Sequence, residues 1–181
     1  MNIALYILVG VLLLLVTVFF VYSFIKDRIT RKRTQQEIKR IEKEATIFAY
    51  ENCAKIDALI QNNSKQMENF VPSVGEYKMS DLVKASDSYL NKILNSIEYR
   101  SYIDESEQYL DFKKNLLMLK ETNSNLWTKK LPFVLEWFNK NVQNYKQQLE
   151  KINETDVIEI KDQQELAMEV ENEYQKLLKQ S

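Results

Sequence analysis

The apolar residues of this chain are distributed in two different ways. Residues 3–25 carry no charge and read IALYILVGVLLLLVTVFFVYSFI, whereas later apolar residues recur at spacings of three and four. A helix of about 20 apolar residues crosses the hydrocarbon core of a bilayer. The first run therefore predicts a single transmembrane helix over residues 3–25, with Tyr6 and Tyr22 near the two interfaces.

A cleaved signal peptide is the alternative interpretation of the same run. Such a peptide has a basic segment before the apolar run and small residues at its cleavage site. Here only Met1 and Asn2 precede the run, and the bulky Phe24 and Ile25 end it. These features favour a retained anchor.

Basic residues follow the apolar run directly. Residues 26–43 hold eight basic and three acidic residues, whereas residues 44–181 hold 17 basic and 23 acidic ones. Because positive charge stays on the cytoplasmic side, residues 1–2 form an external tail, residues 26–43 a basic juxtamembrane helix and residues 44–181 a cytoplasmic domain at the cell membrane. We expect five residues to contact the membrane surface: Lys26, Arg28, Arg31, Lys32 and Arg33. The alternative is that this basic segment only fixes orientation during insertion.

Apolar stripes predict helices in the remainder of the chain. The first helix continues without Pro or Gly to residue 71, with a stripe at Ile38, Ile41, Ala45, Phe48, Ile56, Leu59, Ile60, Asn63, Met67 and Phe70. Further stripes at residues 82–97, 109–126, 131–152 and 166–177 are separated by short breaks. This pattern predicts an all-α fold, in which one N-terminal transmembrane helix precedes an antiparallel three- or four-helix bundle with a long first helix.

Several local signals set the expected helix ends. Pro72–Gly75 is the strongest breaker, and a second helix is expected to begin after a cap at Ser80 or Asp81. The polar residues 101–104 are expected to separate it from a third helix. Pro132 either starts a helix or kinks one. Residues 153–156 read as a turn, and VIEI at 157–160 is a candidate strand without an evident partner.

Composition excludes most catalytic chemistry. Among 181 residues there are no His, one Cys and two Gly, so no imidazole base, disulfide, cysteine zinc site or glycine-rich phosphate loop can form. Four acidic residues, Asp104, Glu105, Glu107 and Asp111, lack the glycine of a calcium loop and read as a solvated helix start. The ten Tyr and two Trp fill a core better than they form a ligand-stacking surface. We expect no catalytic residue, cofactor or metal, and the net acidic body argues against nucleic-acid binding.

Three segments resemble the LemA family. Ile56-Asp57 followed by Asn69-Phe70-Val71, Val74 and Tyr77 is similar to its first segment; Tyr109 to Lys113 with Asn115, and Phe138-Asn139 with Val142 and Tyr145, are similar to two later ones. The resemblance covers residues 50–152. It implies a membrane-anchored helical bundle and supplies no catalytic activity.

Two functions fit these expectations. The first is a non-catalytic scaffold or adaptor at the cytoplasmic face, which contacts the lipid bilayer and unidentified protein partners or further copies of itself as a homo-oligomer. The alternative is a stalk-like subunit of a larger membrane-associated assembly, such as envelope, division or secretion machinery. An exposed apolar patch of several hundred Å² would favour the second.

Overall fold

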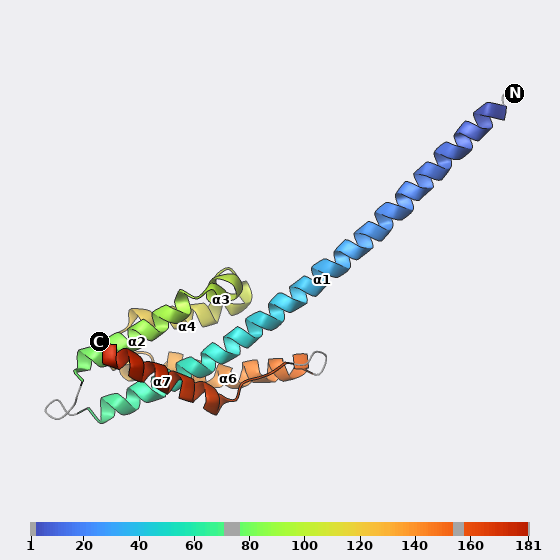
Figure 1. The fold of residues 1–181 in the computed structure, drawn as a ribbon. Coiled ribbons are helices and arrows are strands. Elements are labelled where there is room, and N and C mark those ends of the chain that lie inside the picture. Colours follow the sequence, from blue (N-terminus) through green and yellow to red (C-terminus); the bar gives the residue numbers. More distant parts are fainter. Residues whose placement is uncertain (1–2, 71–76, 154–157, 181) are drawn as a thin grey trace. The chain divides into compact units, whose positions relative to one another are not determined.

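The computed structural model describes residues 3–70, 77–153 and 158–180, and the regular structure in these ranges is entirely helical (Figure 1). For residues 3–9, 11, 13 and 14 only the backbone is described. The chain divides into two units, Met1–Ile41 and Glu42–Ser181. The all-α prediction is confirmed, and residues 158–160 of the VIEI segment form no strand.

Helix α1 (Ile3–Glu68) runs for 66 residues and contributes to both units. Its length follows from the absence of Pro and Gly between Val11 and Val71, since these are the residues that most strongly interrupt a helix. Among the residues whose side chains are described, which leave out most of residues 3–14, no helical stretch is long and apolar enough to cross a bilayer.

In its described residues, the second unit continues with nine shorter helical segments. These are α2 (Met79–Leu94), α3 (Ile97–Tyr99), the π-helix η1 (Arg100–Asp104), the 3₁₀ helix η2 (Glu107–Tyr109), α4 (Leu110–Glu121), the 3₁₀ helix η3 (Ser124–Leu126), α5 (Trp127–Lys130), α6 (Pro132–Asn153) and α7 (Gln163–Gln180). Pro132 starts α6, where its missing N–H leaves no helical hydrogen bond unmade. The expected breaker at Pro72–Gly75 and most of the expected turn at 153–156 lie outside the described residues.

Hydrogen bonds to α1 define the direction of the other long helices. Three residues meet Asn63 near the end of α1: Ser86 in α2, Ser124 after α4 and Tyr174 in α7. Near the beginning of the α1 segment in the second unit, the Thr46 hydroxyl forms a hydrogen bond with the hydroxyl of Tyr109, which precedes α4. Tyr50 donates to the carbonyl of Lys161, which precedes α7. Helices α4 and α7 therefore run in the same direction as α1, and α2 and α6 lead back between them.

The bundle contains more helices than expected. In the part of the second unit that the structure describes, the α1 segment from residue 42 and helices α2, α4, α6 and α7 make five long helices rather than three or four. Each reverses the direction of the one before it, which confirms the antiparallel arrangement.

Helix α1 is enclosed along five turns of the second unit. No residue from Lys43 to Ile60 is exposed, and all of them are described. Eleven residues of α1 are buried: Ala45, Thr46, Ala49, Tyr50, Asn52, Cys53, Ala54, Ile56, Leu59, Ile60 and Asn63. Small side chains at Ala45, Ala49 and Cys53, spaced one turn apart, let neighbouring helices approach closely. The stripe begins later than expected, because Ile38 and Ile41 are 50% and 42% exposed.

Two expected helix boundaries were wrong. Helix α2 begins at Met79, before Ser80 and Asp81, because Asp81 stabilises the helix start from within the first turn by accepting a 2.9 Å hydrogen bond from the Lys78 N–H. Residues 101–104 form part of η1, and the breaks lie on either side of that segment, at Asn95 and Ser96 and at Glu105 and Ser106. The Ser96 hydroxyl caps α3 by accepting from the Tyr99 N–H.

Most tyrosine and tryptophan side chains fill the core, as expected. Six tyrosines are buried: Tyr50, Tyr89, Tyr99, Tyr109, Tyr145 and Tyr174. Trp127 is also buried, and its indole N–H donates to the carbonyls of Leu119 and Thr122 at 3.0 and 2.8 Å. These carbonyls lie at the end of α4, and that of Leu119 also accepts from the Thr122 N–H at 3.3 Å.

A buried polar network joins α1 to three other segments. The Asn63 amide donates to the carbonyl of Ser124 at 3.0 Å, and its oxygen accepts from the hydroxyls of Ser86 and Tyr174 at 3.1 and 3.4 Å. The same hydroxyls lie 3.0 and 3.3 Å from the carbonyl oxygen of Leu82. Two hydroxyl protons thus face two acceptors. The side-chain hydroxyl of Ser124, by contrast, is buried without a hydrogen-bond partner among the described residues.

We predict that Asn63→Leu destabilises the protein although leucine is more apolar. The substitution removes the donor to the Ser124 carbonyl and one of the two acceptors of the Ser86 and Tyr174 hydroxyls. A buried polar group left unsatisfied costs about 1–3 kcal/mol. Urea unfolding of the full chain in detergent, followed by circular dichroism, measures the loss. Gln66→Leu, at an exposed position one turn later, is the control and should change stability by less than about 0.5 kcal/mol. Equal stability of the two variants would contradict the role of the network.

Candidate functional site

The first unit exposes apolar side chains on all sides of α1. From Leu12 to Ile25, among the side chains that the structure describes, ten large ones are between 43% and 69% exposed: Leu12, Leu15, Val16, Val18, Phe19, Phe20, Val21, Tyr22, Phe24 and Ile25. Contact with water costs about 25 cal/mol for each Å² of such surface. A continuous exposed apolar surface of this kind marks a site that is covered by a membrane or a partner.

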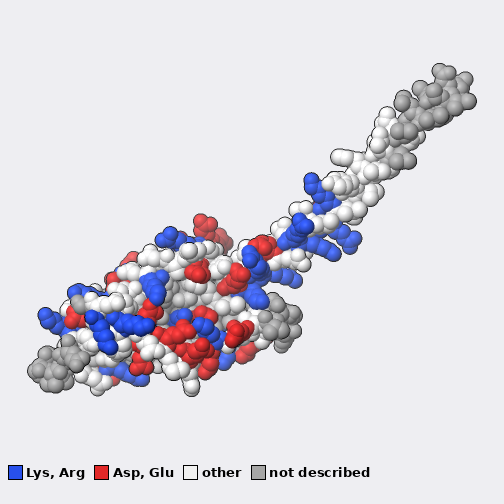
Figure 2. All heavy atoms as spheres, viewed as in Figure 1, with Lys and Arg blue, Asp and Glu red and all other residues white. Residues whose placement is uncertain are grey.

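The five predicted membrane-contact residues follow this surface on the same helix. Lys26, Arg28, Arg31, Lys32 and Arg33 are all exposed. Over seven residues a helix rises by about 10 Å, so five positive charges lie within that length, accompanied by one acidic residue, Asp27. Figure 2 shows Lys and Arg side chains gathered along this part of α1. The structure thus brings the predicted residues together but leaves the contact with lipid a prediction.

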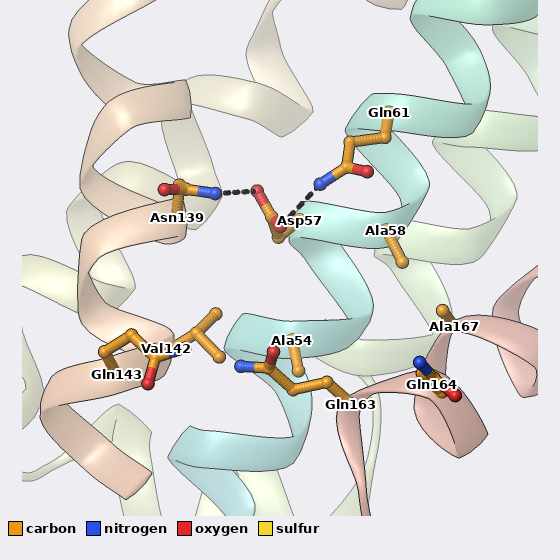
Figure 3. A pocket seen from close by; sticks show the side chains of 10 residues that line it. All are labelled: Ala54, Asp57, Ala58, Gln61, Asn139, Val142, Gln143, Gln163, Gln164 and Ala167. Carbon is orange, nitrogen blue, oxygen red and sulfur yellow. Dashed lines mark hydrogen bonds between the residues drawn. The ribbon is translucent and has the colours of Figure 1, made fainter. Parts of the chain in front are cut away.

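The second unit contains a polar groove that the sequence analysis did not find. The groove has a volume of about 270 Å³ and lies between α1, α6 and the start of α7 (Figure 3). Its floor is made of small apolar side chains: Ala54, Ala58, Val142 and Ala167. Five carboxamides surround this floor: Gln61, Asn139, Gln143, Gln163 and Gln164. We refer to these residues together with Asp57 as the Asp57 groove.

Asp57 supplies the charge of this groove. Gln61 donates to Asp57 Oδ2 at 2.8 Å, one turn away on α1, and Asn139 of α6 approaches Oδ1 at 3.5 Å. Figure 3 shows both amides directed at the carboxylate. Burial raises the pKa of Asp57 above its ordinary value, and the hydrogen bonds from Asn139 and Gln61 lower it in part. Among the described residues, no Lys or Arg forms an ion pair with Asp57.

This arrangement suits recognition of a polar group. Carboxamides offer both hydrogen-bond donors and hydrogen-bond acceptors. The small alanine side chains leave space for a ligand close to the backbone of α1. Cys53 lies beneath it, fully buried, and burial raises the pKa of its thiol well above the usual range. A nucleophilic thiolate at this position is therefore strongly disfavoured.

The acidic residues near the start of α4 form a different arrangement. Lys113 pairs with the Asp104 carboxylate at 2.5 Å and donates to its carbonyl at 2.8 Å. In the described part of the chain no group of three or more His, Cys, Asp or Glu is placed to hold a metal ion. A solvated helix start therefore remains the simpler interpretation of these acidic residues.

The groove residues carry little signal in the sequence. Gln61, Gln143 and Gln164 are spaced like solvent-facing positions of amphipathic helices, and their convergence depends on how three helices pack. The only available signal was indirect. Asp57, Asn139 and Val142 are positions on which the family resemblance rests, and the structure places all three in the groove.

We predict that Asp57→Asn stabilises the protein at pH 7. The folded-state pKa of Asp57 is raised, so the ionised carboxylate disfavours folding, and stability falls as the pH rises from the unfolded-state pKa, about 4, through the folded-state value. The variant lacks this penalty and keeps a hydrogen-bonding side chain. Thermal melts of the full chain in detergent should show a higher Tm for the variant at pH 7 and a difference that vanishes below about pH 4. A lower Tm at pH 7 would show that the carboxylate is needed for folding.

No family model, curated protein or solved structure matches this chain. The resemblance to the LemA family therefore stays a prediction that rests on the segments quoted above.

Proposed function

We propose that this protein is a non-catalytic, membrane-anchored helical bundle that acts as a scaffold or adaptor at the cytoplasmic face of the cell membrane. The observation that carries the proposal is the exposed apolar surface of α1, which is followed directly by five exposed basic residues. An apolar segment and a basic segment in this order are typical of a single-pass anchor.

The lengths of these segments support the anchor. The uncharged run of 23 residues exceeds the about 20 that a membrane-spanning helix needs. Arg33 lies eight residues after Ile25, a rise of about 12 Å along the helix. Lys26 to Arg33 therefore stay close to the Debye length of about 8–10 Å from the lipid surface, where each basic group contributes about 1 kcal/mol. The same charges favour an external N-terminus and a cytoplasmic second unit.

The chemistry of the second unit supports a role without catalysis. The chain contains no imidazole. Its one thiol, that of Cys53, lies in the core, where burial raises its pKa. The groove around Asp57 presents amides and one carboxylate, which suit the recognition of polar groups. Binding through this surface fits a scaffold or adaptor.

A stalk-like subunit of a larger assembly is the second candidate. Helix α4 carries three exposed apolar side chains, Leu110, Leu117 and Met118. Leu110 and Leu117 are two turns apart and share a face of the helix, which favours an apolar contact with another subunit or a second copy of the chain. The remaining large exposed apolar residues of the unit, Ile97, Phe133 and Met168, lie on three other helices.

Cysteine labelling on intact cells tests the proposed anchor and its orientation. We predict that a membrane-impermeant maleimide modifies Asn2→Cys but reaches Ser181→Cys only after the cells are opened, because the N-terminus lies outside. The parent chain is the control, since its only cysteine, Cys53, is fully buried. Labelling of Ser181→Cys on intact cells would overturn the orientation, and release of the protein from membranes by alkaline carbonate would overturn the anchor.

A further inference from the structure

The Asp57 groove holds a carboxylate without a cation. Its two oxygens face carboxamides of α1 and α6, and the lining contains no Lys or Arg. A half-buried carboxylate gains most from a positively charged partner, because the surrounding protein screens the interaction less than water does. The neighbouring side chains donate hydrogen bonds to the carboxylate, but none of them carries a positive charge that would neutralise it.

The size of the groove limits what can occupy it. Pockets that enclose cofactors and drug-sized ligands have volumes of about 300–1,000 Å³. At about 270 Å³, with one side open to solvent, the groove suits a single side chain better than a whole cofactor. The floor of Ala54, Ala58 and Ala167 is smooth and apolar, as the aliphatic stem of a long side chain requires.

From these features we propose that the groove binds the guanidinium group of an arginine side chain presented by a partner protein, with Asp57 as its counter-ion. This inference rests on the proposed adaptor function and names the chemistry of its partner. Guanidinium is planar and has five N–H donors. The groove offers the Asp57 carboxylate as the charged acceptor, and the carboxamides of Asn139, Gln143 and Gln163 line it as further hydrogen-bonding groups.

The contact between Asn139 and Asp57 leaves room for this partner. At 3.5 Å between Nδ2 and Oδ1 it is a weak hydrogen bond, whereas the Gln61 bond at 2.8 Å is of ordinary length. A guanidinium N–H can therefore replace Asn139 at Oδ1 at little cost. The displaced amide then turns its oxygen to a second N–H of the ligand.

The N-terminus of α7 also lies at the groove, but it does not require an anionic ligand in place of a cation. A helix N-terminus favours negative charge, and this charge is already provided by Asp162, which precedes the helix, and by Glu165 in its first turn. The local field that remains in the groove is set by Asp57.

Nuclear magnetic resonance titration of the full-length chain in detergent micelles tests the proposal. The probe is Nα-acetyl-arginine amide; the comparison compounds are the citrulline amide, which has the same shape without charge, and the lysine amide. The arginine compound should shift the side-chain amide signals of Gln61 and Asn139 to saturation. The other two compounds should bind at least about tenfold more weakly, because citrulline lacks the charge and lysine lacks the planar fork of N–H donors.

Two sets of variants decide whether Asp57 is the counter-ion. Asp57→Asn should weaken binding of the arginine compound about tenfold. Gln143→Glu adds a carboxylate at an exposed position of the groove and should tighten binding, whereas Gln147→Glu, one turn along α6 and outside the groove, should not. The Gln143 and Gln147 pair remains decisive if Asp57→Asn fails to fold.

The proposal is overturned by the absence of saturable shifts, by equal binding of the citrulline or lysine compound, or by equal affinities of the Gln143→Glu and Gln147→Glu variants. The cysteine-labelling result is independent of this titration. Failure of the arginine site therefore leaves the proposed membrane anchor standing, and failure of the anchor leaves the titration interpretable.

Discussion

The enclosure of α1 between Lys43 and Ile60 is the constraint on which the second unit depends. Four long helices surround this segment, so nearly every side chain along five turns has to fit a neighbour. Alanine and cysteine at one-turn spacing keep the helices close, and larger residues such as Ile56 and Leu59 fill the spaces between them. The few polar residues that are enclosed must find partners, which is why Asn63 binds three separate segments.

The Asp57 groove is a consequence of the same arrangement. Where α6 and α7 do not close completely over α1, a charged residue can remain on an otherwise enclosed helix. Asp57 occupies this position, and the surrounding carboxamides stabilise its carboxylate without neutralising it. The charge therefore stays available to a ligand, whereas polar residues such as Thr46 and Asn63 are satisfied within the core.

Local features of this fold were predictable from the sequence and its long-range features were not. The spacing of Leu166, Val170 and Tyr174 identified the buried face of α7, and Pro132 marked a possible helix start. The five apolar stripes did not reveal that all of them share one core, because spacing does not specify which helices meet. The partners of Asn63 lie 23 to 111 residues away along the chain. The groove was missed for the same reason, since it exists only where three helices converge.

One helix thus serves two environments: its apolar N-terminal part is proposed to lie in lipid, and its C-terminal part forms the centre of the bundle. Hydrogen–deuterium exchange of the full chain in lipid nanodiscs tests this claim most directly. The account predicts two slowly exchanging segments of α1, residues 3–25 and 45–63, separated by faster exchange over the exposed residues 28–41. Fast exchange of 45–63 compared with the amides of α2 and α7, or protection of 3–25 that is the same without lipid, would contradict it.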